Sequence, residues 1–214
     1  MNAASSTRMV DLRAGYYDAI NAMQTGTYKK DGDILDWTLW DRFEVDGTTP
    51  TLIHRLFVNG LGSPGGVAGN RNLADTNLVG NQGIPLGQKL YIRAIKLFYR
   101  ADEVRTPTEH VSWHDMLANT TLNIQIPGKD SYGQWALDEL MGISTSMMNV
   151  PAATNYNPSN SVGRYVGIFP LNLPIVLSSQ VAFTVTVEHH VAPAADLDDD
   201  LVKVGLNGIL ERLS

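Results

Sequence analysis

Two histidines lie four residues apart, at His110 and His114, and each has a carboxylate as its neighbour. On a helix this spacing puts both imidazoles on one face, where they could ligate a metal ion while Glu109 and Asp115 orient them. A zinc peptidase carries a glutamate directly after its first histidine, and this sequence does not. No third ligand is specified, and Pro107 favours an irregular loop over a helix. We therefore predict no metal site.

The other histidines and the acidic run do not indicate a stronger site. His189 and His190 are adjacent, so on a strand they point to opposite faces and cannot chelate one ion; His54 stands alone in a predicted strand. A cupin-type enzyme needs two histidines one residue apart, and no His-x-His occurs. The run at 198–200, three aspartates, directly precedes an apolar segment, which favours a helix start over a metal site. We predict no catalysis.

A glycine pattern at Gly60, Gly62 and Gly65 has the spacing of a dinucleotide-binding fingerprint. Pro64 interrupts it, and no periodic helix follows to bind a pyrophosphate at its N-terminus. The segment 59–83 is therefore predicted to be a surface loop without a cofactor. Because the chain has no cysteine, a disulfide framework and a thiolate site are excluded.

The chain has 214 residues, which fits one domain, 1–214, able to bury roughly 70% of its unfolded surface. Its formal net charge of −6 argues against a protein that binds nucleic acid by neutralising phosphates. No apolar run is long enough for a membrane-spanning helix, and the first residues lack the apolar segment of a signal peptide. We expect a soluble protein made without a secretion signal.

The clearest structural signal is a strand at 84–100. Apolar residues alternate with polar ones on both sides of Ala94, where the phase shifts once. Such a shift within a long strand predicts a bulge or bend, which is typical of curved antiparallel sheets. We therefore expect this strand to be central to a β-rich domain.

Further extended segments follow the same alternation. Pro170 and Pro174 lie in the segment that precedes the closing strand at 183–187. They predict that this segment is an edge strand or a crossing segment. The turn at 46–50 predicts that 51–58 is the partner of the strand before it. The sequence thus predicts an all-β, jelly-roll-like sandwich of about eight strands, with extended segments at 34–45, 51–58, 84–100, 120–126, 164–169 and 183–187.

Helical spacing predicts three helices. One is short, internal and spans 135–141; the others are amphipathic and lie in an N-terminal arm, 1–30, and at the C-terminus, 196–214. We interpret the terminal helices as docking elements for other subunits. The predicted subunit-contact residues are Met9, Leu12, Tyr16, Ile20, Leu201, Val202, Leu206, Ile209, Leu210 and Leu213.

Three separated blocks occur in an order found in one family: a Thr-Asn and Pro-Gly-rich approach to a long strand, a shorter strand that ends in a loop and a small helix, and a late Pro-Ile pair before the closing strands. The blocks are Thr76–Pro85 leading into Gln88–Tyr99, Leu122–Ile126 with Pro127–Lys129, and Pro174–Leu177 leading into Phe183–Val187. Together they resemble the jelly-roll capsid proteins of tailless icosahedral bacteriophages.

The resemblance implies a vertical jelly roll that packs beside copies of itself in capsomers of an icosahedral shell, often over an internal membrane. Its partners would be copies of itself, other capsid proteins and an internal virion membrane, without direct binding of nucleic acid. It would be made in the host cytoplasm and reside in the virion. The chain is too short for two jelly rolls, so it departs from the double-barrel members; a single-jelly-roll coat protein, a minor capsid protein and a vertex protein all remain open.

A carbohydrate-binding or adhesion module is the alternative function. Jelly rolls often bind sugars, and tryptophans supply flat faces on which sugar rings stack. Buried tryptophans would count against this alternative. The candidates are Trp37, Trp40, Trp113 and Trp135.

Overall fold

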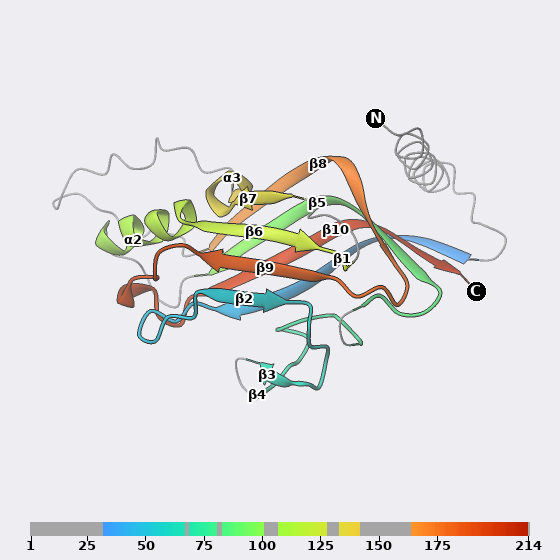
Figure 1. Cartoon of the computed structure of the whole chain (residues 1–214), viewed down its shortest axis with the longest axis horizontal. Helices are drawn as coiled ribbons and strands as arrows, with labels where there is room; N and C mark the ends of the chain where they lie inside the picture. The colour runs from blue at the N-terminus through green and yellow to red at the C-terminus, as the bar shows by residue number, and fades with distance from the viewer. Residues whose placement is uncertain are drawn as a thin grey trace.

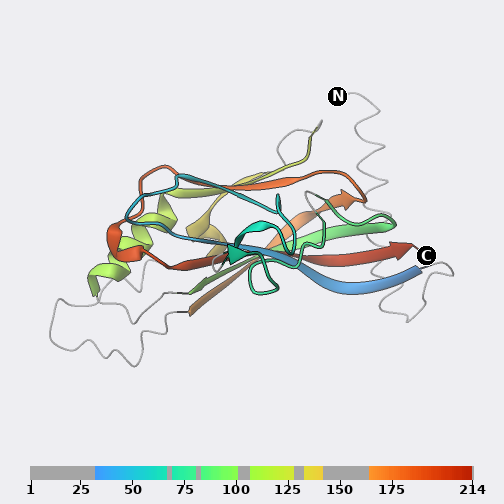
Figure 2. The same ribbon diagram turned by 90° about the horizontal axis from the view of Figure 1, so that it is seen from below.

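The computed structural model describes residues 32–66, 69–80, 83–100, 107–127, 133–141 and 164–213. Eight strands form two antiparallel sheets of four, which lie face to face as two layers (Figures 1 and 2). The long sheet has the order β1 (Gly32–Glu44), β10 (Leu201–Leu213), β5 (Gln88–Arg100), β8 (Arg164–Ser178). The short sheet has the order β2 (Ile53–Leu56), β9 (Thr184–His189), β6 (Thr120–Gln125), β7 (Gln134–Ala136).

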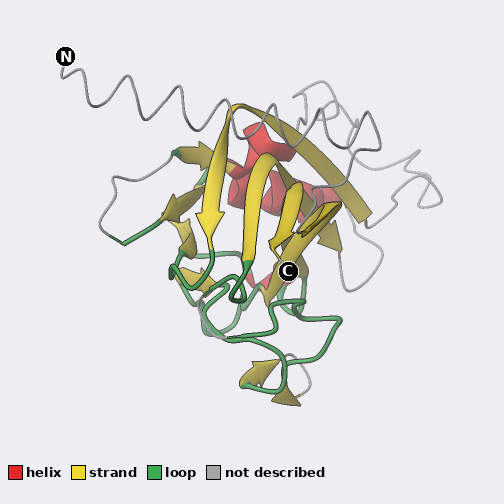
Figure 3. Ribbon diagram, turned by 90° about the vertical axis from the view of Figure 1, so that its right-hand side faces the viewer, coloured by secondary structure: helices red, strands yellow, loops and turns green. Residues whose placement is uncertain are grey.

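The smaller elements lie outside the two sheets. α2 (Pro107–Ala118) lies at one end of the sandwich, beside the 3₁₀ turn η3 (Ala195–Leu197), and α3 (Leu137–Met141) follows β7 (Figure 1). A two-stranded hairpin of β3 (Pro64–Gly66) and β4 (Gly69–Asn70) projects away from both sheets (Figure 3).

The strand pairing is nested. β1 pairs with β10, β2 with β9, β5 with β8 and β6 with β7, all antiparallel. The chain therefore follows one long antiparallel ribbon that turns back between β6 and β7. Every connection between these eight strands passes from one sheet to the other, except the one from β6 to β7.

The core lies between the two sheets and follows the alternation of each strand. In β9, Val185 and Val187 are fully buried while the threonines between them are partly exposed, and β6 places Leu122 and Ile124 in the same layer. Apolar residues of all four long-sheet strands complete one continuous cluster. The prediction of an all-β sandwich is thereby confirmed.

The bulge predicted at the phase shift is present in β5. Ile92 and Ala94 pair with consecutive residues of β10, so Arg93 between them has no opposite residue. The pairing of β5 with β8 has a larger irregularity at the same place, because Ile92 pairs with Ile175 and Ala94 with Pro170. A Cβ atom at Gly208, opposite the bulge, would overlap the carbonyl oxygen of Tyr91, so only glycine fits there. β8 lies at the edge of the long sheet, as Pro170 and Pro174 predicted.

The predicted C-terminal helix at 196–214 is wrong. Residues 201–213 form β10, which lies between β1 and β5 in the interior of the long sheet. Val202, Val204 and Leu206 are buried on one face, and Asn207 and Ile209 are buried on the other, so the later part of the run is buried on both faces. A strand that is covered on both faces cannot be told from a helix by periodicity alone, which explains the error.

Two further expectations need correction. Residues 107–118 form helix α2 and not an irregular loop, because Pro107 occupies the first helical position, where its missing N–H is tolerated. The segment 51–58 contributes β2, which pairs with β9 within the short sheet and not with the preceding strand, β1, which belongs to the long sheet. The short internal helix is confirmed over 137–141, while 134–136 is a strand. The predicted N-terminal arm, 1–30, lies outside the described residues.

Candidate functional site

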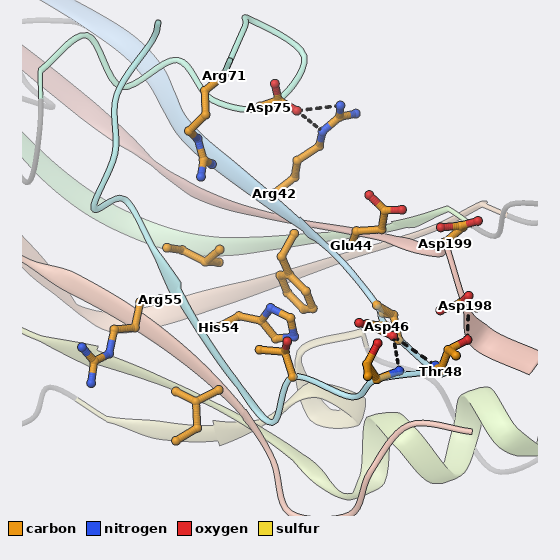
Figure 4. A pocket seen from close by; sticks show the side chains of 16 residues that line it. Arg42, Glu44, Asp46, Thr48, His54, Arg55, Arg71, Asp75, Asp198 and Asp199 are labelled. Carbon is orange, nitrogen blue, oxygen red and sulfur yellow. Dashed lines mark hydrogen bonds and ion pairs between the residues drawn. The ribbon is translucent and has the colours of Figure 1, made fainter. Parts of the chain in front are cut away.

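An open pocket of about 760 Å³ lies where the ends of β1 and β2 meet the loops before β10 (Figure 4). Its walls are mostly polar and carry both signs of charge. The charged residues and the histidine that line it are Arg42, Glu44, Asp46, His54, Arg55, Arg71, Asp75, Asp198 and Asp199.

One wall is organised by Asp41, which points inward from β1 and is fully buried. Its carboxylate forms an ion pair with Arg71 and accepts hydrogen bonds from the backbone N–H groups of Arg42 at 2.9 Å and Phe57 at 2.6 Å. A buried carboxylate is stable only when it is paired and hydrogen-bonded in this way. Burial lowers the pKa of Arg71, and the negative charge of Asp75 opposes that shift. Asp41 therefore fastens the segment after β2 to the sandwich.

The segment after β2 is attached to β1 a second time, through Asp75. The buried carboxylate of Asp75 accepts hydrogen bonds from Arg42 Nε at 2.7 Å and from the backbone N–H of Asn72 at 2.9 Å. Oδ1 of Asp75 also lies 2.6 Å from Arg42 Nη2 (Figure 4). Such two-point pairing of arginine with a carboxylate fixes both side chains. The segment 59–83, predicted as a surface loop, thus holds buried charges that the sequence analysis missed.

The opposite rim of the pocket is acidic. Asp46 caps its own turn by accepting hydrogen bonds from the backbone N–H groups of Thr48 at 3.0 Å and Thr49 at 2.6 Å. Asp198 accepts from the Thr48 hydroxyl at 3.0 Å (Figure 4). A hydrogen bond with the Asp199 side chain raises the pKa of Glu44, and burial raises it further. These carboxylates are therefore held in place by the turn that bears them.

Beneath the pocket, two histidines meet inside the sandwich. His54 stacks on Phe43 with ring centroids 4.1 Å apart and meets His189 edge-on at 5.3 Å. The Thr120 hydroxyl donates to the carbonyl of Met116 at 2.6 Å, so the ring Nδ1–H of His189 donates to that hydroxyl at 2.7 Å. Burial lowers the pKa of both His54 and His189 to about 4. Both imidazoles are thus neutral at pH 7 and belong to the core.

No family model and no curated protein matches this chain. Within the described part of the chain, no three histidine, aspartate or glutamate side chains are arranged to hold a metal ion. No helix there is long and apolar enough to cross a membrane. The geometry of the pocket thus offers fixed charges for polar contacts.

The structure places the predicted contact residues of the C-terminal segment inside the subunit. Val202, Leu206, Ile209 and Leu210 of β10 are buried, and Leu201 is partly exposed at the start of that strand. They therefore stabilise the long sheet and are not a separate docking helix. Leu213 ends β10, but its side chain is outside the described set. Met9, Leu12, Tyr16 and Ile20 also lie outside the described residues.

The histidines at 110 and 114 both fall on α2. The His114 ring packs against Trp113 with centroids 4.8 Å apart, and burial lowers its pKa. The side chain of His110 is outside the described set, so the spacing argument remains a prediction. The aspartate run is not a helix start: Asp200 is buried and accepts a hydrogen bond from the Tyr99 hydroxyl.

The tryptophans differ in environment. Trp113 is only 1% exposed, and Trp135 packs against Phe169 with ring centroids 6.5 Å apart. Trp40 is half-buried and donates its indole N–H to the carbonyl of Leu73 at 3.3 Å. Trp37, at 37% exposure, is the most open of the four. They do not form one stacking platform, because they lie on separate elements and faces.

Proposed function

We propose that this protein is a viral structural protein, a capsid subunit that assembles into capsomers of an icosahedral phage shell. The nested strand pairing carries the proposal. A ribbon that pairs its first strand with its last, its second with its next to last, and so on, gives a jelly roll when it is wrapped into two facing sheets. The jelly roll is a common architecture of capsid domains.

The sequence blocks that resemble the phage capsid family support the same assignment. The Thr-Asn pair lies against the edge of β1, the long strand is β5 at the centre of the long sheet, and the closing strand is β9. The blocks thus take different structural roles within one sandwich. We infer that the partners are copies of this chain, other capsid proteins and an internal virion membrane, without direct contact to nucleic acid. The protein would be made in the host cytoplasm and reside in the virion.

A carbohydrate-binding module has weaker support. It would need aromatic faces gathered on one surface, and Trp113 is buried in the core while Trp135 packs beneath β8. The outer face of the short sheet carries threonine, asparagine and glutamine side chains, which could hydrogen-bond to a sugar. A glycan array with the full chain would reveal that activity.

The direct test is the mass of the purified full chain by light scattering across a hundredfold range of concentration, with negative-stain electron microscopy of each fraction. Trimers, pentamers, hexamers or closed shells support the capsid proposal. A monomer at every concentration, with specific binding on the glycan array, would overturn it in favour of the carbohydrate module.

A further inference from the structure

The outer face of the long sheet is basic. Because neighbouring residues in a strand alternate in direction, Lys96 points outward between the buried Ile95 and Leu97, and Lys203 points outward between two buried valines. By the same alternation the described side chains of this face, which we call the basic face, include six cations, Arg42, Lys89, Arg93, Lys96, Arg100 and Lys203, against three carboxylates, Asp36, Glu44 and Glu211.

Four of these cations, Lys89, Lys96, Arg100 and Lys203, form no ion pair with a carboxylate of the described residues. Arg93 forms an ion pair with Asp36, and Arg42 forms one with Asp75 in the segment after β2. Lys96 reaches only the hydroxyl of Thr38, at 3.5 Å, and the ammonium of Lys203 lies 5.3 Å from the centre of the Trp40 ring. Burial lowers the pKa of Lys203, and the charge of Arg42 lowers it further, so an added carboxylate there would be stabilising.

One row across this face combines an aromatic ring, a cation and an apolar side chain. Gly205 lies between Trp40 and Lys96 in this row and is itself buried. Ile168, at 61% exposure, continues the same row on β8. An exposed apolar residue beside cations and an aromatic ring is the usual composition of a protein interface, with an apolar centre and a charged surround.

The opposite charge is gathered at the end of the sandwich. Four exposed or partly exposed carboxylates lie in the turn after β1 and in the 3₁₀ turn and the residues that follow it before β10, and we call them the acidic end: Asp46, Asp196, Asp198 and Asp199. Figure 4 shows three of them, Asp46, Asp198 and Asp199. None of the four forms an ion pair with a cation of the described residues. Thr48 donates hydrogen bonds to Asp46 and Asp198 and thereby orders the turn after β1 against the residues before β10. Little conformational entropy is therefore lost when this end docks.

We propose that the acidic end of one copy of this chain docks on the basic face of the next copy. The contact joins two different surfaces of the same molecule, so it is heterologous and generates a ring when the rotation closes. This inference rests on the capsid proposal and deepens it, because it names the surfaces that join neighbouring subunits in a capsomer.

Charge reversal tests the contact. Lys96→Glu with Lys203→Glu makes the basic face acidic, and Asp196→Lys with Asp199→Lys makes the acidic end basic. Each double variant alone is expected to associate at least tenfold more weakly than the wild-type chain, as measured by light scattering. An equimolar mixture of the two is expected to regain the wild-type mass, because each acidic surface then meets a basic one.

A matched control lies on the outer face of the short sheet. Glu188→Lys reverses an exposed charge there, outside the pocket, and is expected to leave the association constant within twofold of wild type. Thermal melting of every variant identifies misfolding. Should the lysine substitutions unfold the turn, Asp196→Asn with Asp199→Asn removes the charge and keeps the shape.

Raising the salt from 0.1 M to 1 M, which shortens the screening length from about 10 Å to about 3 Å, is expected to dissociate wild-type oligomers.

The outcomes separate this inference from the capsid proposal. Oligomers whose mass is unchanged by Lys96→Glu with Lys203→Glu, or a mixture that fails to regain mass, would overturn the contact and leave the capsid proposal standing. A wild-type chain that binds a DNA oligonucleotide would also overturn the contact if Lys96→Glu with Lys203→Glu loses that binding and keeps the wild-type oligomeric mass. A wild-type chain that is monomeric at every concentration would overturn the contact, and specific binding of that monomer on the glycan array would overturn the capsid proposal as well.

Discussion

Asn77 completes the hydrogen bonding of β1 at Trp40. Its side-chain Oδ1 accepts the backbone N–H of Trp40 at 2.7 Å, and its Nδ2 donates to the carbonyl of Thr38 at 2.8 Å. The backbone N–H of Asn77 donates to the Trp40 carbonyl as well, at 3.2 Å. One asparagine thus imitates a short strand at the edge of the long sheet. Covering an edge in this way protects it from pairing with other chains.

Asn77→Ala is therefore expected to reduce the free energy of unfolding by about 1–3 kcal/mol, because it leaves a partly buried N–H and a carbonyl without partners. Urea denaturation measures the loss. Asn70→Ala, at an exposed position of β4, is the control and is expected to change stability by less than about 0.5 kcal/mol. Equal losses for both variants would show that the side chain of Asn77 does not support β1.

Gly208 marks the place where β10 passes closest to the bulge of β5. A methyl group there would overlap the backbone of Tyr91, which cannot move without breaking the ladder. Gly208→Ala is expected to destabilise the fold by about 2–4 kcal/mol, measured by thermal or urea unfolding. Gly80→Ala is the matched control, since nothing lies within 4 Å of its added Cβ atom. A Gly208→Ala variant as stable as the control would contradict the close approach.

The histidine pair makes stability depend on pH. His54 and His189 keep a pKa of about 4 in the folded protein, whereas unfolded histidines take up protons near pH 6.5. Between these values the unfolded chain binds more protons. The free energy of unfolding is therefore highest above pH 6.5 and falls toward pH 4, by at most about 1.4 kcal/mol per pH unit for each histidine.

Urea denaturation at half-unit steps of pH measures this slope. His54→Phe with His189→Phe is expected to flatten it, because phenylalanine keeps the ring packing and removes the titrating nitrogen atoms. His190→Asn, at an exposed position, removes only a minor cause of the lowered pKa of His189 and is expected to change the slope far less than the double variant. A double variant with the wild-type slope would assign the acid sensitivity to other groups.

The alternation of apolar residues predicted the sandwich and several of its strands. It even located the bulge, because a phase shift at Ala94 has no other explanation in a strand that is buried on one face. The pattern failed for β10, because residues 204–211 are buried on both faces and the adjacent apolar pair Ile209 and Leu210 interrupts the alternation. It also failed for α2, where Pro107 was taken as a helix breaker although the first turn tolerates proline.

The polar interior was harder to predict, because it depends on partners that are distant in sequence. Asp41 stands at an inward position of its strand, between Leu39 and Phe43, and this phase was a usable signal that the carboxylate is buried. Nothing local identifies Arg71, 30 positions later, as its partner. The meeting of His54 with His189 likewise follows from the pairing of β2 with β9, which no short-range pattern reveals.

Because β10 lies between β1 and β5, its removal tests the architecture directly. The predicted docking helix would have been dispensable for folding, whereas deletion of residues 201–214 is now expected to abolish the folded state, since β1 would lose its strand partner. Circular dichroism and amide proton dispersion by NMR measure the outcome. Leu206→Ala, a smaller change at a fully buried site of the same strand, is expected to cost about 2–5 kcal/mol and to leave the fold measurable. A truncated chain that keeps a cooperative unfolding transition would place β10 outside the core and restore its role as a docking element.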